Sequence, residues 1–233
     1  MTAIYFSCCI VGLLLITNSI GFVYSMLVIY TPWFNRFKIQ AKAYRKGIFW
    51  KRMPLYLSNF LMLLVFSGVG SYLVFPYLES TWINPGWIAL QVLVAFVVDD
   101  VFFYFYHRWL HQNKYMLGKV HSIHHRASPP FPLEYLYAHP LEWMLGMLGA
   151  VLGFAVAALV MPLNVYAVLV FGALRNLHEI HIHSDLNVPV LSQIPLLSKT
   201  KHHDDHHSFL EGNYASTFIW WDRLFKTEIK EKS

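Results

Sequence analysis

The chain has 233 residues, of which 56% are hydrophobic and only 13% are charged, and its net charge is +5 at pH 7. A soluble domain usually carries about 25% charged residues, so the composition excludes an ordinary soluble domain and indicates a membrane protein. The two cysteines, Cys8 and Cys9, are adjacent in an apolar segment. This arrangement excludes a disulfide framework and a cysteine-based zinc site. Thirteen histidines are present and none precedes residue 107.

The apolar segments predict about five membrane-spanning helices, in chain order at residues 4–30, 54–77, 87–107, 141–160 and 163–177. The first carries no charge and lacks the Lys/Arg start and cleavage site of a secretory signal, which indicates a retained helix. The last two form a hairpin because Pro162 interrupts a segment that is too long for one span. We expect an all-α integral membrane protein, with residues 1–53 as an N-terminal membrane helix and basic surface segment and residues 54–233 as a membrane-embedded domain.

The positive charges predict the orientation of these spans. All eighteen Lys and Arg residues fall on the side that receives residues 36–52, 107–139 and 178–233, counting Arg175 at the end of the last span. By the positive-inside rule this side is cytoplasmic, and it also carries all thirteen histidines. The basic surplus is therefore explained by topology and anionic lipid, and it does not require a nucleic acid partner. We expect a cytoplasmic helical cap that holds the histidines.

The histidines occur in three clusters at helical spacing, which are His107 and His111, then His121, His124 and His125, then His203, His206 and His207. Residues three or four apart share a helix face, so each cluster is expected to aim at one centre, as in metal sites of helical bundles. A single histidine is more often a hydrogen-bonded interfacial residue, but three such clusters on one side of a membrane favour metal binding. Eight to ten imidazoles suit two metals of four or five ligands each. Imidazole accepts Zn, Cu, Fe or Ni, so ligand type alone does not choose among them.

Two carboxylates lie inside the third predicted span. Asp100 and Tyr104 share a helix face with His107 and His111, and Asp99 is adjacent. Carboxylates within a membrane are costly and are usually functional. We expect Asp100 to accept the second ring N–H of a ligand histidine and so fix its orientation. The alternatives are that it caps a water pocket or pairs with a lysine.

At these residues the chain resembles the fatty acid hydroxylase/sterol desaturase superfamily of membrane-bound non-haem di-iron enzymes, over about residues 95–227. The shared motifs are one HxxxH and two HxxHH boxes, formed by the three clusters in order. Residues 137–142 (YAHPLE) resemble a stretch of the sterol C4-methyl oxidase branch. Residues 212–216 (GNYAS) and 220–225 (WWDRLF) resemble the ending of that branch, where Lys226 replaces a glycine.

The resemblance implies that two iron ions are bound by ten histidines, namely His107, His111, His121, His124, His125, His178, His183, His203, His206 and His207. The choice of His178 and His183 rests on the resemblance, and His181 is an alternative ligand. His139, His181 and His202, with Asp100, are expected beside the ligands or facing the substrate. Zinc can replace iron in a purified protein of this kind.

The implied reaction is the insertion of oxygen from O2 into an unactivated C–H bond of a lipid, such as a sterol or a fatty acyl chain. Phe102, Phe103, Trp143 and Phe171 are candidates to line the lipid cavity, although core packing explains most such residues. No haem motif, iron–sulfur cysteine set or dinucleotide-binding loop is present, so electrons must come from a separate donor, a cytochrome b5- or ferredoxin-type carrier with its reductase. The basic surface suits such an acidic carrier, and it suits lipid equally well.

Three other functions are weighed against the hydroxylase. A desaturase would use the same di-iron site, and spacing cannot separate the two reactions. A membrane metal-binding or transport protein would need liganding groups along the membrane interior, whereas these histidines gather at one end. A scaffold without catalysis is disfavoured because all three boxes are intact. The expected location is a bacterial inner membrane or the endoplasmic reticulum.

Overall fold

The computed structural model describes residues 1–189 and 197–229, and within them the regular secondary structure is helical apart from isolated β-bridges. Among these described residues, four helical segments are long and apolar enough to cross a membrane. These are α1 (Ala3–Tyr30), α2 (Ile48–Val74) with its 3-10 extension η2 (Phe75–Tyr77), α3 (Pro85–Gln112), and the pair α4 (Pro140–Gly146) and α5 (Leu148–Val160). The prediction of an all-α membrane protein is confirmed.

The fifth predicted span, at residues 163–177, lies in α6 (Val165–Ile182). Pro162 separates α5 from α6 as predicted, and Asn164 caps α6 by accepting a hydrogen bond from the backbone N–H of Tyr166 at 3.0 Å. The helix is not among the four long apolar ones. Its last two turns carry charged and polar side chains, beginning with Arg175. Whether α6 crosses the membrane, as the fifth span, therefore stays a prediction.

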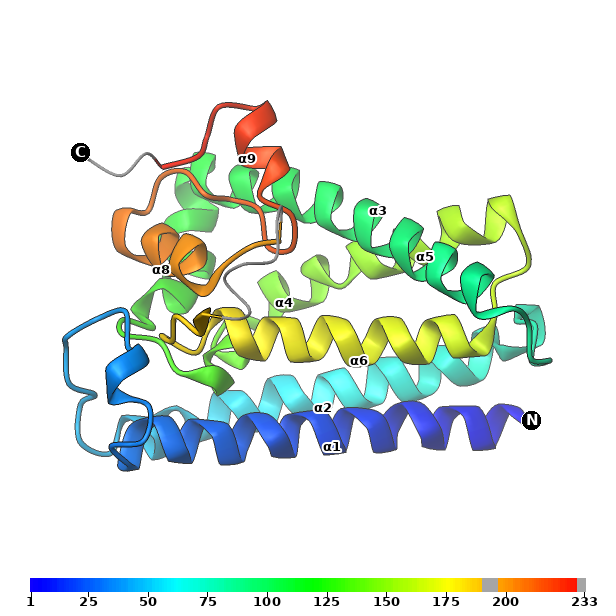
Figure 1. The fold of residues 1–233 in the computed structure, drawn as a ribbon, viewed down its shortest axis with the longest axis horizontal. Helices are drawn as coiled ribbons and strands as arrows, with labels where there is room; N and C mark the ends of the chain where they lie inside the picture. Colours follow the sequence, from blue (N-terminus) through cyan, green and yellow to red (C-terminus); the bar gives the residue numbers. More distant parts are fainter. Residues whose placement is uncertain (190–196, 230–233) are drawn as a thin grey trace.

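The helices pack as two pairs with α6 between them (Figure 1). The lower pair is α1 with α2, the upper pair is α3 with α5, and α6 contacts both α1 and α3. Two glycines allow α5 to lie against α3. A Cβ atom at Gly153 would lie 2.5 Å from the Ala95 carbonyl oxygen, and one at Gly149 would meet the Asp99 side chain. Because only glycine permits this approach, α5 is held on α3.

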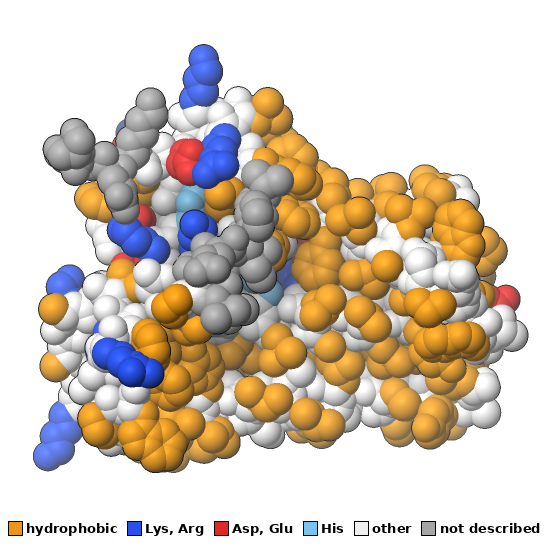
Figure 2. All heavy atoms as spheres, in the orientation of Figure 1, with side chains coloured by type: hydrophobic (Ala, Val, Ile, Leu, Met, Phe, Trp, Pro, Cys, Tyr) orange, Lys and Arg blue, Asp and Glu red, His pale blue; other side chains and the backbone are white. Residues whose placement is uncertain are grey.

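Short helices and loops gather at one end of the bundle, where α1 and α3 finish and α2 begins (Figure 1). They are η1 (Asn35–Phe37), a π-helical turn η3 (Met116–Val120), the 3-10 helices η4 (His121–Arg126) and η5 (Pro132–Leu136), and the helices α8 (Thr200–Phe209) and α9 (Trp220–Leu224). Figure 2 shows Lys and Arg side chains at this end and hydrophobic side chains over the rest of the visible face. The other end carries the N-terminus and the turn at Pro162.

The sides of the bundle are apolar where they face outward. Ile16 on α1 is 64% exposed, Leu61 on α2 is 61% exposed and Leu159 on α5 is 86% exposed. Large apolar side chains on so much of the surface would be costly in water but are the expected exterior in lipid. This chain is therefore a membrane protein whose polar, histidine-bearing segments lie at one end of the bundle.

Candidate metal centre

Nine histidines form two groups at the polar end of the bundle. In each group, every histidine contributes one ring nitrogen, and these nitrogens all lie within 4.8 Å of one another. The first group is His107, His111, His121, His125 and His206, and the second group is His124, His183, His203 and His207. The expectation that all three clusters come together is confirmed.

Each HxxHH box is divided between the two groups. In η4, His121 and His125 belong to the first group, whereas His124 belongs to the second. In α8 the order is reversed, because His203 and His207 belong to the second group and His206 to the first. Adjacent residues on an α-helix point about 100° apart, so neighbouring histidines of α8 face different centres. The expectation that each cluster aims at a single centre is wrong for both HxxHH boxes.

Hydrogen bonds at Nδ1 orient three of the five rings of the first group. His107 Nδ1 donates to the Tyr214 carbonyl oxygen at 2.8 Å, and His206 Nδ1 donates to the Gly212 carbonyl oxygen at 2.7 Å. His121 Nδ1 lies 2.8 Å from Glu142 Oε1. Since a carbonyl oxygen can only accept, Nδ1 of His107 and of His206 carries the proton and Nε2 of each ring presents its lone pair to the other histidines of the group.

Two of the four rings of the second group are oriented in the same way. His183 Nδ1 donates to the Glu179 carbonyl oxygen at 2.8 Å, and His124 Nδ1 donates to the Tyr137 carbonyl oxygen at 3.3 Å. Their Nε2 atoms are 3.5 Å apart, and His203 Nε2 lies 3.0 Å from His183 Nε2. His207 Nε2 is 3.1 Å from His203 Nε2. All four rings are buried, so no bulk water solvates these nitrogens.

The donor set fits bound metal ions. His124 Nε2 and His183 Nε2 are both unprotonated, because each Nδ1 donates to a carbonyl oxygen, yet the two Nε2 atoms lie 3.5 Å apart. Two lone pairs at this distance repel each other unless a cation lies between them, and His206 Nε2 is buried with no hydrogen-bond partner. Imidazole nitrogens suit the divalent first-row metals, iron and zinc included.

Burial also keeps these imidazoles neutral. It lowers the pKa of His121 and of His124 to about 3. It lowers the pKa of His203, His206 and His207 well below the ordinary value, and the neighbouring histidines add to the effect. A group with a depressed pKa is unprotonated at neutral pH, and the unprotonated ring is the form that binds a metal.

Four other predicted histidines lie outside both groups. His178 Nε2 donates to the Ser216 carbonyl oxygen at 3.0 Å, so the geometry favours His183 over His178 as a ligand. His181 Nε2 lies 3.4 Å from the Thr200 hydroxyl. His139 Nδ1 accepts a hydrogen bond from the Leu141 backbone N–H and caps α4. His202 Nε2 lies 3.0 Å from Asp222 Oδ2. The hydrogen-bond partners of these four histidines are therefore not among the nine grouped rings.

Asp100 does not orient a histidine, and that prediction is wrong. Its carboxylate accepts hydrogen bonds from the backbone N–H groups of Thr217 and Phe218 at 2.7 and 2.9 Å. It therefore fixes the C-terminal segment to α3. Asp99, beside it, pairs with Arg175 of α6 at 2.6 Å. Helical spacing shows which side chains share a face of α3, but the group that each side chain contacts depends on how other segments pack there.

Sequence reasoning missed the residues that hold the rings. They are the Glu142 carboxylate and the carbonyl groups of Tyr137, Glu179, Gly212 and Tyr214. Glu142 could have been found, since it ends the YAHPLE stretch and is an acid at the start of an apolar span. A carbonyl group has no sequence signal of its own.

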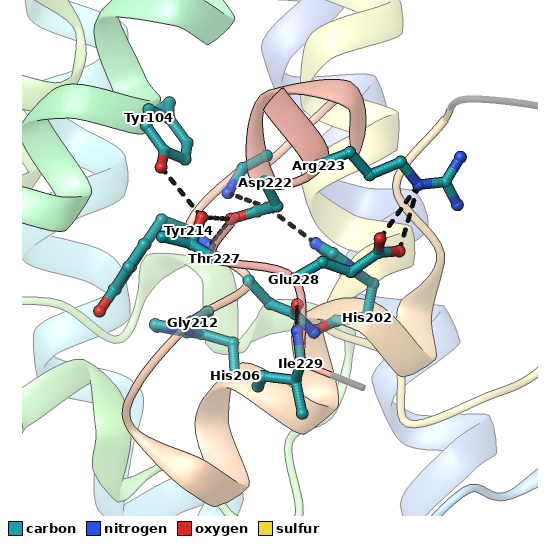
Figure 3. A network of polar contacts seen from close by, with 12 residues as sticks. Tyr104, His202, His206, Gly212, Tyr214, Asp222, Arg223, Thr227, Glu228 and Ile229 are labelled. Atoms are coloured by element: carbon teal, nitrogen blue, oxygen red, sulfur yellow. Dashed lines mark hydrogen bonds and ion pairs between the residues drawn. The ribbon is translucent and has the colours of Figure 1, made fainter. Parts of the chain in front are cut away.

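Asp222 organises the segment that supplies two of these carbonyl groups (Figure 3). Its buried carboxylate accepts hydrogen bonds from the backbone N–H groups of Tyr214 at 2.8 Å and Ala215 at 2.9 Å. It also accepts a hydrogen bond from the Thr227 hydroxyl at 2.7 Å. Gly212 adopts φ +84°, which glycine tolerates, and this bend directs its carbonyl group to α8.

A cavity of about 550 Å³ leads from the histidines into the bundle. Its inner end is lined by His107, His121, His124, His183 and His203, with Glu142 beside them. The rest of the wall is mostly apolar and includes the predicted Phe103, Trp143 and Phe171. Phe102 is not part of the wall and instead stacks on Tyr106. A cavity of this size and lining suits one lipid-sized molecule.

Comparison with known proteins agrees with this site. The sequence model of the fatty acid hydroxylase family matches residues 92–227. A methylsterol monooxygenase from Rattus norvegicus is 33% identical over 94% of this chain and 77% of its own length. One from Danio rerio is 32% identical over 89% of this chain and 71% of its own length. A very-long-chain aldehyde decarbonylase from Oryza sativa subsp. indica is 35% identical over 84% of this chain and 74% of its own length. No solved structure matches the chain.

Proposed function

Because the chain belongs to the fatty acid hydroxylase family and is a membrane-bound, lipid-oxidising monooxygenase, we propose that it uses two iron ions to hydroxylate an unactivated C–H bond of a lipid. The observation that carries this proposal is the position of the two histidine groups at the inner end of an apolar cavity. A lipid carbon placed there lies beside the metal ligands and away from bulk water.

The two irons are assigned to the two groups. One is held by His107, His111, His121, His125 and His206, and the other by His124, His183, His203 and His207. Iron bound there supplies the activation of O2, in which one oxygen atom enters the C–H bond and the other leaves as water after uptake of two electrons and two protons. The histidine nitrogens would bind the ions, and carbonyl groups at the Nδ1 atoms of His107, His124, His183 and His206 hold those four rings in place.

The cavity wall orients the lipid and excludes water. Phe103 lies against the His107 ring, with ring centroids 5.1 Å apart, so apolar surface continues up to the ligands. Glu142 is one of the charged residues in the cavity wall, with Arg175 and Glu179. Its Oε1 holds His121, and its buried Oε2 has no hydrogen-bond partner. This oxygen can accept a proton or a hydrogen bond from a group at the inner end of the cavity.

The electrons come from a separate protein. We assign this role to a cytochrome b5- or ferredoxin-type carrier with its reductase, which docks at the polar end of the bundle. The Lys and Arg side chains at this end support the assignment, because they complement an acidic carrier (Figure 2). By the positive-inside rule the same charges support a cytoplasmic location for this end, and we propose a bacterial inner membrane or the endoplasmic reticulum as the compartment.

The relatives suggest which substrates to test first. A methyl-bearing sterol is the first candidate, because methylsterol monooxygenases match nearly the whole chain. A very-long-chain aldehyde is the second candidate, because an aldehyde decarbonylase is similarly related. A desaturase reaction remains the alternative outcome at the same metal site. Metal transport is disfavoured because the nine grouped histidines lie at one end of the bundle.

The test is product analysis with purified protein in lipid nanodiscs, supplied with iron, a reductase and carrier, and oxygen labelled with a heavy isotope. A product that gains one labelled oxygen atom supports the hydroxylase. A product that loses two hydrogens and gains no label identifies a desaturase. The His124→Ala variant should lose bound iron and product together, while stoichiometric zinc with no O2 consumption on addition of reductant would overturn the oxygenase proposal.

A further inference from the structure

The cavity opens on the side of the bundle between α2 and α5. Its wall includes Phe66 and Val74 of α2, which are 49% and 46% exposed, and Val151 of α5, which is 60% exposed. Ala155 and Ala158 of α5 also line the cavity and are exposed. Residues that both line a cavity and face the exterior mark its mouth. Since the exterior at this depth is apolar, the mouth faces the membrane core rather than water.

The helix packing explains why this side is open. Gly149 and Gly153 hold α5 close to α3, and α2 lies along α1. Among the described helices, α2 and α5 form no comparable pair. Gly70 widens the gap further, because a Cβ atom built there meets nothing within 4 Å. The opening therefore follows from the same glycine contacts that build the bundle.

The cavity is long as well as apolar. Its wall runs along α4 and α5 from Glu142, beside the histidines, to Ala158 near the opposite end. Sixteen residues of helix rise about 24 Å. Along α2 the wall runs from Leu63 to Tyr77, which lies just beyond the helix. A compact ligand would leave most of this length empty, whereas an elongated molecule would fill it.

We propose that the gap between α2 and α5 is a lateral mouth through which an elongated lipid enters from the membrane core. The lipid then lies along the cavity with its leading end against the two histidine groups. The inference rests on the proposed function, which supplies the oxidation reaction. Binding of the lipid in the cavity requires neither metal nor turnover. It also predicts that oxidation occurs near one end of the lipid, because only that end reaches the histidines.

The test uses a long-chain alcohol with a diazirine at its far end, in phosphatidylcholine nanodiscs, followed by illumination and mass-spectrometric mapping of labelled residues. In the wild type we expect labelling on the inner wall, at Phe103 and Trp143. Ala155→Trp and Gly70→Leu fill the mouth, and each should reduce inner-wall labelling roughly tenfold, equivalent to about 1.4 kcal/mol. The matched controls are Val156→Trp and Val69→Leu, because these exposed side chains are not part of the cavity wall. Both controls should leave the inner-wall labelling unchanged.

The outcomes separate this inference from the proposed function. Inner-wall labelling that survives both mouth-filling variants, or falls equally in the controls, overturns the lateral mouth. A fall in labelling as the protein-to-lipid ratio rises would mean that a second copy of the chain covers the gap, which also overturns it. Circular dichroism of each variant shows whether the helices are retained. Intact labelling without any oxidised product would refute the monooxygenase and leave the mouth in place.

Discussion

His206 and His207 are adjacent in α8, yet they belong to different histidine groups, with ring planes 84° apart. The same division occurs in η4, where His124 and His125 are separated. Each HxxHH box therefore contributes to both centres, and the two boxes hold the centres side by side. This relationship is the basis for assigning each ion its own ligands.

Single substitutions in α8 should remove different ions. We expect His206→Ala to weaken the first centre and His207→Ala the second, so each variant keeps about one of the two ions of the wild type. Metal content per chain, with iron spectroscopy of the remaining ion, measures this. His178→Ala is the matched control and should keep both ions, because His178 lies outside the two groups. Loss of an ion from His178→Ala would show that the ligand assignment is wrong.

Glu142→Gln should weaken metal binding without unfolding the protein. The substitution replaces the carboxylate that holds His121 with a neutral amide, and such changes cost about 10- to 100-fold in metal affinity. Competition with a chelator of known affinity measures the change. Glu134→Gln is the control, because Glu134 pairs with Arg52 at 2.6 Å and also accepts a hydrogen bond from the Tyr56 hydroxyl. It should reduce stability while the folded fraction keeps its metal affinity, and equal affinity losses in both variants would refute the role of Glu142.

Asp222→Asn should loosen the segment that orients His107 and His206. The carboxylate accepts hydrogen bonds from two backbone N–H groups and from the Thr227 hydroxyl. Hydrogen bonds to a buried charge each contribute about 1.5–3 kcal/mol to stability. We expect a lower unfolding temperature and a lower metal content. Asp205→Asn is the control, since its ion pair with Lys201 is partly exposed and contributes about 1 kcal/mol or less. An unchanged metal content in Asp222→Asn would contradict the argument.

Removal of metal should destabilise the polar end of the bundle. Without a cation, the facing Nε2 lone pairs of His124 and His183 are buried 3.5 Å apart. A ligand that binds only the folded state at about 1,000 times its dissociation constant stabilises that state by about 4 kcal/mol. Thermal unfolding in detergent should therefore shift down on addition of a chelator and recover when ferrous iron is restored. No shift, despite measured loss of metal, would argue against a structural contribution of the ions.

Gly153→Val should push α5 away from α3. The added side chain would meet the Ala95 carbonyl group, and such overpacking costs about 1–3 kcal/mol. Thermal unfolding measures the loss. Gly12→Val is the control, because a Cβ atom at Gly12 on α1 meets nothing within 4 Å. Similar losses in both variants would show that the effect comes from valine itself rather than from the contact with α3.

Much of the fold and of the site is determined by local sequence. Apolar length alone predicts the helices α1, α2, α3 and α5, because a membrane span needs about 20 apolar residues. Pro162 predicts the break between α5 and α6, because proline cannot continue a helix. Spacing predicts that the three clusters bear metal ligands, since residues three or four apart share a face.

Only the tertiary structure decided how these parts meet. Whether His206 joins His107 or His124 depends on the angle at which α8 rests on the bundle, and helical spacing carries no information about that angle. The partner of Asp100 was decided in the same way, because the C-terminal segment packs on α3 where a histidine was expected. The lateral mouth depends on α5 packing against α3 rather than α2. Local sequence determines which face of a helix is polar or apolar, but contacts between distant segments determine what that face meets.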